Sequence, residues 1–201
     1  MIRFFQTLLL TCFLLATIAH ADPPPQPVHA RPISEAWGEE YEAAGNYRQA
    51  FRQYCGAYQQ WQIIDRGNAK RGILDPETQE NLERLLKKIA RTLEKINPPP
   101  AIPEGAVFAA QKGRAFFKLA KDVRDFKAAA EQFELALWSA PEVGDYHYNL
   151  SVSQKSAGQL EAALRTARLA AILARDKTEA HDILALRAEI EAMLEIQNRG
   201  R

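Results

Sequence analysis

The sequence predicts an all-α fold made of stacked helical hairpins. Helix-forming Ala, Leu, Glu, Gln, Lys and Arg dominate a chain of 201 residues that is 47% hydrophobic and 25% charged. Two short amphipathic segments around a glycine turn occur at residues 144–174, and related patterns recur at 34–64 and 104–141 with alanines at matched places. Because one such hairpin cannot bury its apolar face alone, we expect the copies to pack on one another.

The N-terminus has the three parts of a secretory signal. Arg3 precedes an apolar run at residues 4–19, and Ala19-His20-Ala21 has the small-x-small form of a cleavage site. The run is shorter than the ~20 residues of a spanning helix, which favours cleavage over a retained membrane anchor. We therefore expect residues 1–21 to be removed, leaving a periplasmic or secreted protein without stable membrane insertion.

Signal cleavage also sets the charge and the cysteine content. Only Arg3 is lost from the charged residues, so 25 basic and 25 acidic residues remain. A formal net charge of zero argues against a nucleic-acid partner, which requires a surplus of basic groups. Cys55 becomes the only cysteine, which excludes an internal disulfide. Two interpretations remain open: Cys55 is buried as a small apolar group, or it forms an intermolecular disulfide.

The first hairpin follows a tether. Residues 22–33 are proline-rich and predict an extended segment, as a passive spacer or, alternatively, as a proline-motif ligand. Ser34 is the expected N-cap of a helix over 35–44. Gly45 then turns the chain into a second helix over 47–64.

An inserted helix completes the segment 34–97. We expect a polar loop at 65–74, after which Asp75 as N-cap and Pro76 at the first helical position begin the helix. Its apolar stripe of leucines and isoleucines continues to residue 96. Residues 98–104, rich in proline, form a linker.

Two further hairpins and a capping helix are expected over residues 105–196. The first pairs a helix over 106–121 with one over 126–139, which Asp125 caps. Ala129 and Ala163 hold the same place in successive hairpins and lie 34 residues apart. The last helix, from residue 178 to 196, has polar faces suited to the end of a stack. We expect residues 197–201 to form a tail.

At these positions the chain resembles the tetratricopeptide repeat (TPR), a helix–turn–helix of 34 residues with small and aromatic residues at fixed places. The first unit contributes Trp37, Gly38, Tyr41, Gly45, Tyr47, Ala50, Tyr54 and Ala57. The second contributes Phe126, Ala129, Phe133, Ala136 and Pro141, with Phe117 at a usually small position. The third contributes Leu150, Ser151, Gly158, Leu160, Ala163 and Ala170. The register breaks between the first two units, because Ala50 and Ala129 are 79 residues apart.

The resemblance implies a right-handed α-solenoid that binds a protein or peptide on the first helices of its hairpins. On those helices the sequence offers a set of polar and basic side chains: Arg114, Lys118, Lys121, Tyr148, Asn149 and Lys155. We hypothesise that they form one wall of a groove for an acidic or C-terminal peptide. The alternative is a solvated helix face, on which exposed ion pairs contribute only ~0–1 kcal/mol each.

The sequence carries no recognisable catalytic signature. No nucleophile motif, phosphate loop or metal-ligand spacing is present, and His29, His147 and His181 are far apart. We therefore expect a non-enzymatic protein of the cell envelope that uses no cofactor or metal. A binding scaffold is the leading interpretation. A structural or assembly subunit that acts through stable oligomerisation is the alternative.

Overall fold

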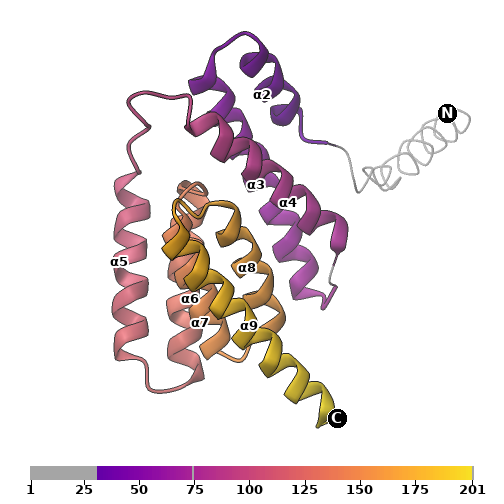
Figure 1. The fold of residues 1–201 in the computed structure, drawn as a ribbon, viewed down its shortest axis with the longest axis vertical. Helices are drawn as coiled ribbons and strands as arrows, with labels where there is room; N and C mark the ends of the chain where they lie inside the picture. The colour runs from indigo at the N-terminus through magenta and orange to yellow at the C-terminus, as the bar shows by residue number, and fades with distance from the viewer. Residues whose placement is uncertain (1–30, 74, 201) are drawn as a thin grey trace, which may run out of the picture. The chain divides into compact units, whose positions relative to one another are not determined.

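The computed structural model describes residues 31–73 and 75–200, and the predicted signal peptide and most of the tether lie outside them. The described residues form eight helices and no strand, within one compact unit (Figure 1). The helices are α2 (Ile33–Ala43), α3 (Tyr47–Lys70), α4 (Pro76–Leu93), α5 (Glu104–Leu119), α6 (Val123–Ser139), α7 (Gly144–Ser156), α8 (Leu160–Ile172) and α9 (Lys177–Arg199). The predicted fold class is confirmed: helical hairpins, an inserted helix and a C-terminal capping helix. None of these helices has the length and apolar composition needed to cross a membrane.

Each hairpin has a small residue where its two helices cross. A Cβ on Gly38 would lie 2.5 Å from Cε1 of Tyr54, and one on Gly113 would lie 3.0 Å from Cε2 of Phe133. In the third hairpin the Ser151 hydroxyl donates to the Ala163 carbonyl at 2.8 Å. The prediction that Phe117 occupies the small position is wrong, because Gly113 occupies it. Four more residues separate the crossing from the aromatic partner in this hairpin than in the first.

The glycine turns are confirmed, whereas several predicted boundaries are wrong. Gly45 and Gly158 both have a φ of 73°, which L side chains rarely adopt. Ser34 lies inside α2, which begins at Ile33. The predicted polar loop 65–74 is mostly helix, because α3 continues to Lys70. A single glycine costs a helix only about 1 kcal/mol. In this last part of α3, Arg66 lies 3.6 Å from the Glu134 carboxylate and 5.5 Å from the centroid of the Trp138 ring, both on α6.

At the other helix ends, the residue that caps the helix is the predicted one in α4 and a different one in α6. Asp75 is the N-cap of α4 as predicted, and its carboxylate accepts from the Glu77 amide. Asp125, by contrast, lies inside α6. The true N-cap is Asp122, whose carboxylate accepts from the amides of Arg124 and Asp125. Helix α9 extends to Arg199, so most of the predicted tail is helical.

Helix α4 interrupts the stack. It packs against α3 and α8, and its leucines share an apolar cluster with Leu169 of α8 and Leu173, the C-cap of that helix. Helix α3 also reaches α6, where the Gln59 amide donates to the Trp138 carbonyl at 2.6 Å. The first hairpin therefore meets the later hairpins through their second helices. The α5–α6 and α7–α8 hairpins stack directly on each other through α6 and α7.

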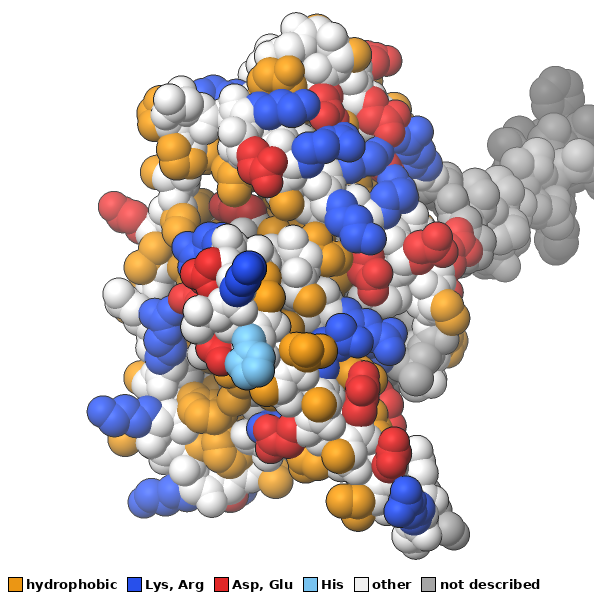
Figure 2. Space-filling model, viewed as in Figure 1, with side chains coloured by type: hydrophobic (Ala, Val, Ile, Leu, Met, Phe, Trp, Pro, Cys, Tyr) orange, Lys and Arg blue, Asp and Glu red, His pale blue; other side chains and the backbone are white. Residues whose placement is uncertain are grey.

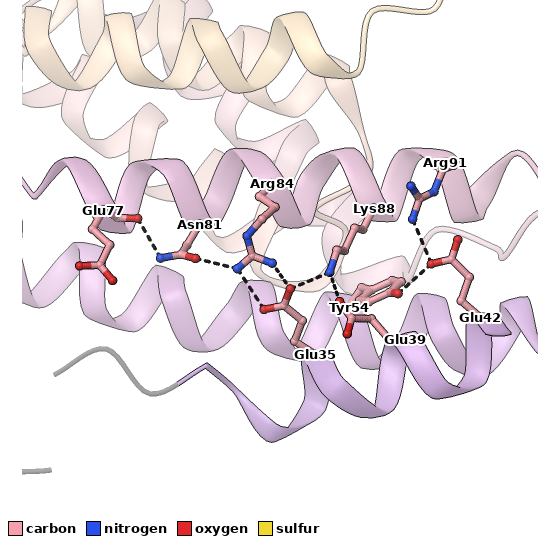
Figure 3. A network of polar contacts seen from close by, with 9 residues as sticks. All are labelled: Glu35, Glu39, Glu42, Tyr54, Glu77, Asn81, Arg84, Lys88 and Arg91. Carbon is pink, nitrogen blue, oxygen red and sulfur yellow. Dashed lines mark hydrogen bonds and ion pairs between the residues drawn. The ribbon is translucent and has the colours of Figure 1, made fainter. Parts of the chain in front are cut away.

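A polar network fastens α4 to α2 (Figure 3). Glu35 is fully buried and accepts hydrogen bonds from Arg84 and, at 2.8 Å, from Lys88. Lys88 also contacts Glu39 at 2.5 Å, and Arg91 donates to a Glu42 oxygen at 3.1 Å. That oxygen accepts from the Tyr54 hydroxyl as well, at 2.8 Å. Three carboxylates spaced i, i+4, i+7 on α2 thus face three cations with the same spacing on α4.

Candidate functional site

The three basic residues predicted around α5 do not share one helical face. Arg114 lies 3.6 Å from the Asp145 carboxylate of α7, with both side chains half-exposed. Lys118 is exposed on the next turn. Lys121 lies beyond the end of α5, and its backbone amide donates to the Asp125 carboxylate at 2.8 Å. Arg114 therefore faces α7, whereas Lys121 belongs to the turn before α6.

The residues predicted on α7 contact three different surroundings. Tyr148 is half-buried against the apolar cluster of α8 and α9. Burial raises its pKa, and so do the nearby carboxylates of Asp182 and Glu189. The Asn149 amide donates to the Asp145 carbonyl on its own helix at 2.6 Å. Lys155 forms an ion pair of 2.8 Å with Glu189 and so joins α7 to α9. The structure therefore does not gather the six predicted residues into a single wall.

A small cavity of about 120 Å³ lies between α7, which is the first helix of the third hairpin, and the capping helix α9. Tyr148 is the one predicted site residue that lines it, and Leu173 and Ile183 supply apolar lining. Three carboxylates border it: Asp145, Glu179 and Asp182. A cavity of this size accommodates one side chain of a partner, since ligand sites usually have volumes of ~300–1,000 Å³.

A larger groove of about 430 Å³ lies between α4 and the helices α8 and α9. The α8 side carries Arg165 and Arg168, one turn apart, and one carboxylate, Glu161; Leu164 and Leu194 supply apolar lining. The opposite side carries carboxyl groups from the end of α3 and the start of α4, together with an amide: Asp65, Asp75, Gln79, Glu80 and Glu83. We call this feature the α4–α8 groove. No sequence pattern predicts this groove, because it exists only where the inserted helix packs on α8.

The charges of the α4–α8 groove are only partly neutralised within the chain. Burial raises the pKa of Asp65, and the Arg165 guanidinium acts in the opposite direction. The Asp75 carboxylate is occupied by its capping bonds to Glu77 and Thr78. Neither Arg165 nor Arg168 has an ion-pair partner at 4 Å or less among the described residues. Arginine presents a planar fork of donors to carboxylates, so α8 offers two such sites to a ligand.

A third cavity, of about 80 Å³, lies where α3, α4, α6, α7 and α8 meet. His147 lines it and is almost fully buried, with Nε2 lying 2.9 Å from the Pro141 carbonyl. Burial lowers the pKa of His147 to about 4, although the Pro141 carbonyl partly opposes the shift. The described part of the chain holds no group of three His, Cys, Asp or Glu side chains placed to bind a metal ion.

The known proteins that match the chain are solved structures. No family model matches the chain, and no curated protein matches it. Among solved structures, a crystal structure of MamA is 16% identical at a TM-score of 0.33, covering 81% of this chain and 96% of that one. A double mutant titled MamA RS-1 ArsTM is 15% identical at a TM-score of 0.32, covering 82% and 98%. Similarity at this level carries no argument about function.

Proposed function

We propose that this protein is a non-catalytic scaffold of the cell envelope that binds a protein segment or peptide in the α4–α8 groove. The observation that carries the proposal is the groove itself, with two arginines on α8 that lack ion-pair partners among the described residues. Its volume of about 430 Å³ falls in the range typical of ligand sites. The resemblance to tetratricopeptide repeats agrees with a role in protein recognition.

The chemistry of the groove specifies the kind of segment that it accepts. Arg165 and Arg168 suit carboxylates, whereas Glu80 and Glu83 on α4 suit a basic residue. Leu164 and Leu194 offer an apolar surface to a side chain between them. An acidic peptide that also carries a lysine or arginine would satisfy both sides at once. We therefore still propose an acidic partner. Its main contacts are Arg165 and Arg168, and not the basic residues predicted on α5.

Peptide binding tests the proposal. Immobilised short peptides of systematically varied charge are probed with the purified protein and with two charge-reversal variants. The variant Arg165→Glu/Arg168→Glu should lose the acidic peptides, and Glu80→Lys/Glu83→Lys should lose those that require a basic residue. Arg52→Glu is the control, because Arg52 is exposed and does not line the groove. If the parent protein selects no peptides, or if both groove variants retain the same set, the proposal is wrong.

The envelope location is part of the proposal and rests on the signal predicted at residues 1–21. Mass spectrometry of the protein isolated from the envelope fraction should give a mature chain that begins at Asp22. A chain that keeps Met1 and fractionates with the cytoplasm would refute export while leaving the groove untouched.

A further inference from the structure

Helix α7 shows which side chains one hairpin buries when it stacks on the hairpin before it. The three side chains are counted from Ser151, the small residue at which α7 crosses α8. Tyr146 lies five positions before Ser151, Leu150 lies one position before it, and Gln154 lies three positions after it. Tyr146 and Leu150 are 5% and 6% exposed and belong to the apolar cluster of α5 and α6. Gln154 is 7% exposed and lines the cavity that α6 of the preceding hairpin also borders, while its side-chain oxygen accepts from the Thr166 hydroxyl of its own hairpin. We call these three positions the stacking face.

The same three positions on α2 are exposed. Counted from Gly38 they are Ile33, Trp37 and Tyr41, which are 69%, 52% and 39% exposed. Two of the three are aromatic, and together they form one stripe because positions i, i+4 and i+8 lie on one side of a helix. Helix α2 is the first described helix, and no hairpin of the described chain covers its stacking face.

The stacking face of α5 is exposed as well. Counted from Gly113 it consists of Phe108, Lys112 and Phe116, and Phe108 is 68% exposed. Leu119 extends the stripe by one turn. The cause is α4, because this helix places the first hairpin against α6 and α8 instead of against α5. Hydrophobic and basic side chains therefore lie next to one another along the α5 edge of the molecule (Figure 2).

The two exposed faces differ in their middle position, and this difference identifies their occupant. The middle residue is Trp37 on α2 and Lys112 on α5. In the single chain, Nζ of Lys112 lies 5.4 Å from the centroid of the Phe116 ring. A contact between two α5 faces would bring lysine against lysine. A contact between α2 and α5 brings lysine against the indole of Trp37 in either helix direction, and an indole is the best aromatic partner of a cation. Exposed Glu40 lies beside the α2 stripe, so it adds a negative charge close to where Lys112 would dock.

We propose that the protein self-associates head to tail, with the α2 stacking face of one copy against the α5 stacking face of the next. The contact is heterologous, so an open assembly keeps one unused α2 face at one end and one unused α5 face at the other until it closes or grows. The proposal does not depend on the α4–α8 groove, because no residue of the two stacking faces lines that groove.

Sedimentation velocity over a range of protein concentrations tests the proposal with the purified protein. The sedimentation coefficient of the parent protein should rise with concentration. Trp37→Glu and Phe108→Glu should each weaken self-association by at least about ten-fold, as expected for a central aromatic residue of an interface. Both residues are largely exposed, so unchanged circular dichroism should show that the variants fold. Ile63→Glu is the matched control, since Ile63 is 59% exposed on α3 and belongs to neither face.

The decisive sample is an equimolar mixture of the two variants. Each variant keeps one intact face, so the mixture should form a one-to-one dimer that neither variant forms alone. A parent protein that is monomeric at every concentration overturns the proposal. So does a Phe108→Glu variant that still self-associates, because the contact would then join two α2 faces. A mixture that stays monomeric overturns the pairing of α2 with α5.

Discussion

Replacement of Glu35 by alanine should destabilise the fold more than any other single loss of charge on α2. The carboxylate is fully buried and accepts from Arg84 and Lys88, which come from a helix 49 or more residues later. Its removal leaves two cations of α4 facing the site where the carboxylate was. Alanine is the best helix former, so helix propensity itself contributes no loss.

The magnitude follows from how far the two cations can regain water. Breaking a buried ion pair by removing one partner costs ~3–5 kcal/mol. The side chain of Arg84 is 39% exposed and that of Lys88 is 17% exposed, so both recover part of their hydration. Lys88 also keeps its contact with Glu39. We therefore expect a loss at the low end of that range, about 3 kcal/mol in the free energy of unfolding.

Urea denaturation followed by tryptophan fluorescence measures this loss, because Trp61 is buried in the cluster that α3 and α4 share. The matched control is Glu40→Ala on the same helix, where the carboxylate is exposed and the expected change is within about 0.5 kcal/mol. A loss below about 1 kcal/mol for Glu35→Ala, with an unchanged denaturant slope, would refute the view that this pair fastens α4.

Three further predictions concern single residues of the interior. Gly38→Ala should destabilise the protein, because the new Cβ would lie 2.5 Å from the Tyr54 ring. Gly56→Ala should stabilise the protein by about 0.5–1 kcal/mol, because the space around Gly56 is open. Thermal unfolding of the two variants measures both changes. Burial raises the pKa of the half-buried Cys55 thiol, so thiol reagents at pH 8 should modify it more slowly in the folded than in the unfolded protein, and a non-reducing gel should show monomer. His147 has a pKa lowered to about 4, so between pH 6.5 and pH 4 the unfolded chain binds a proton that the folded chain does not. Stability should therefore fall by up to about 3 kcal/mol on acidification through that window, and urea midpoints of His147→Gln should show a smaller fall.

Features that depend on a few neighbouring residues could be predicted from the sequence. The turns at Gly45 and Gly158 and the start of α4 at Asp75 are of this kind, since one residue supplies the required backbone or side-chain geometry. Where two candidate capping residues lie close together, the local sequence does not distinguish them, and the prediction of Asp125 was wrong. Asp122 and Asp125 form a reciprocal pair, in which Asp122 accepts from the first amides of α6 and Asp125 reaches back to the Lys121 amide.

The candidate site could not be predicted in this way, because it depends on where an inserted helix packs. Arg165 and Arg168 read as ordinary charged residues of an amphipathic helix until α4 is placed beside α8. The predicted wall of Arg114, Lys118 and Lys121 assumed an uninterrupted helical face, and α5 ends at Leu119.

One sequence signal does bear on the placement of α4. Glu35, Glu39 and Glu42 have the same spacing as Arg84, Lys88 and Arg91, so two helices that cross side by side can pair all three charges in one register. A shift of either helix by one residue would rotate its charges by about 100° and leave Glu35 buried without a cation. The register of α4 on α2 is therefore specified by the cost of that unpaired carboxylate. The same placement directs α4 toward α8 to form the groove, and it keeps the first hairpin away from α5, whose apolar face stays exposed.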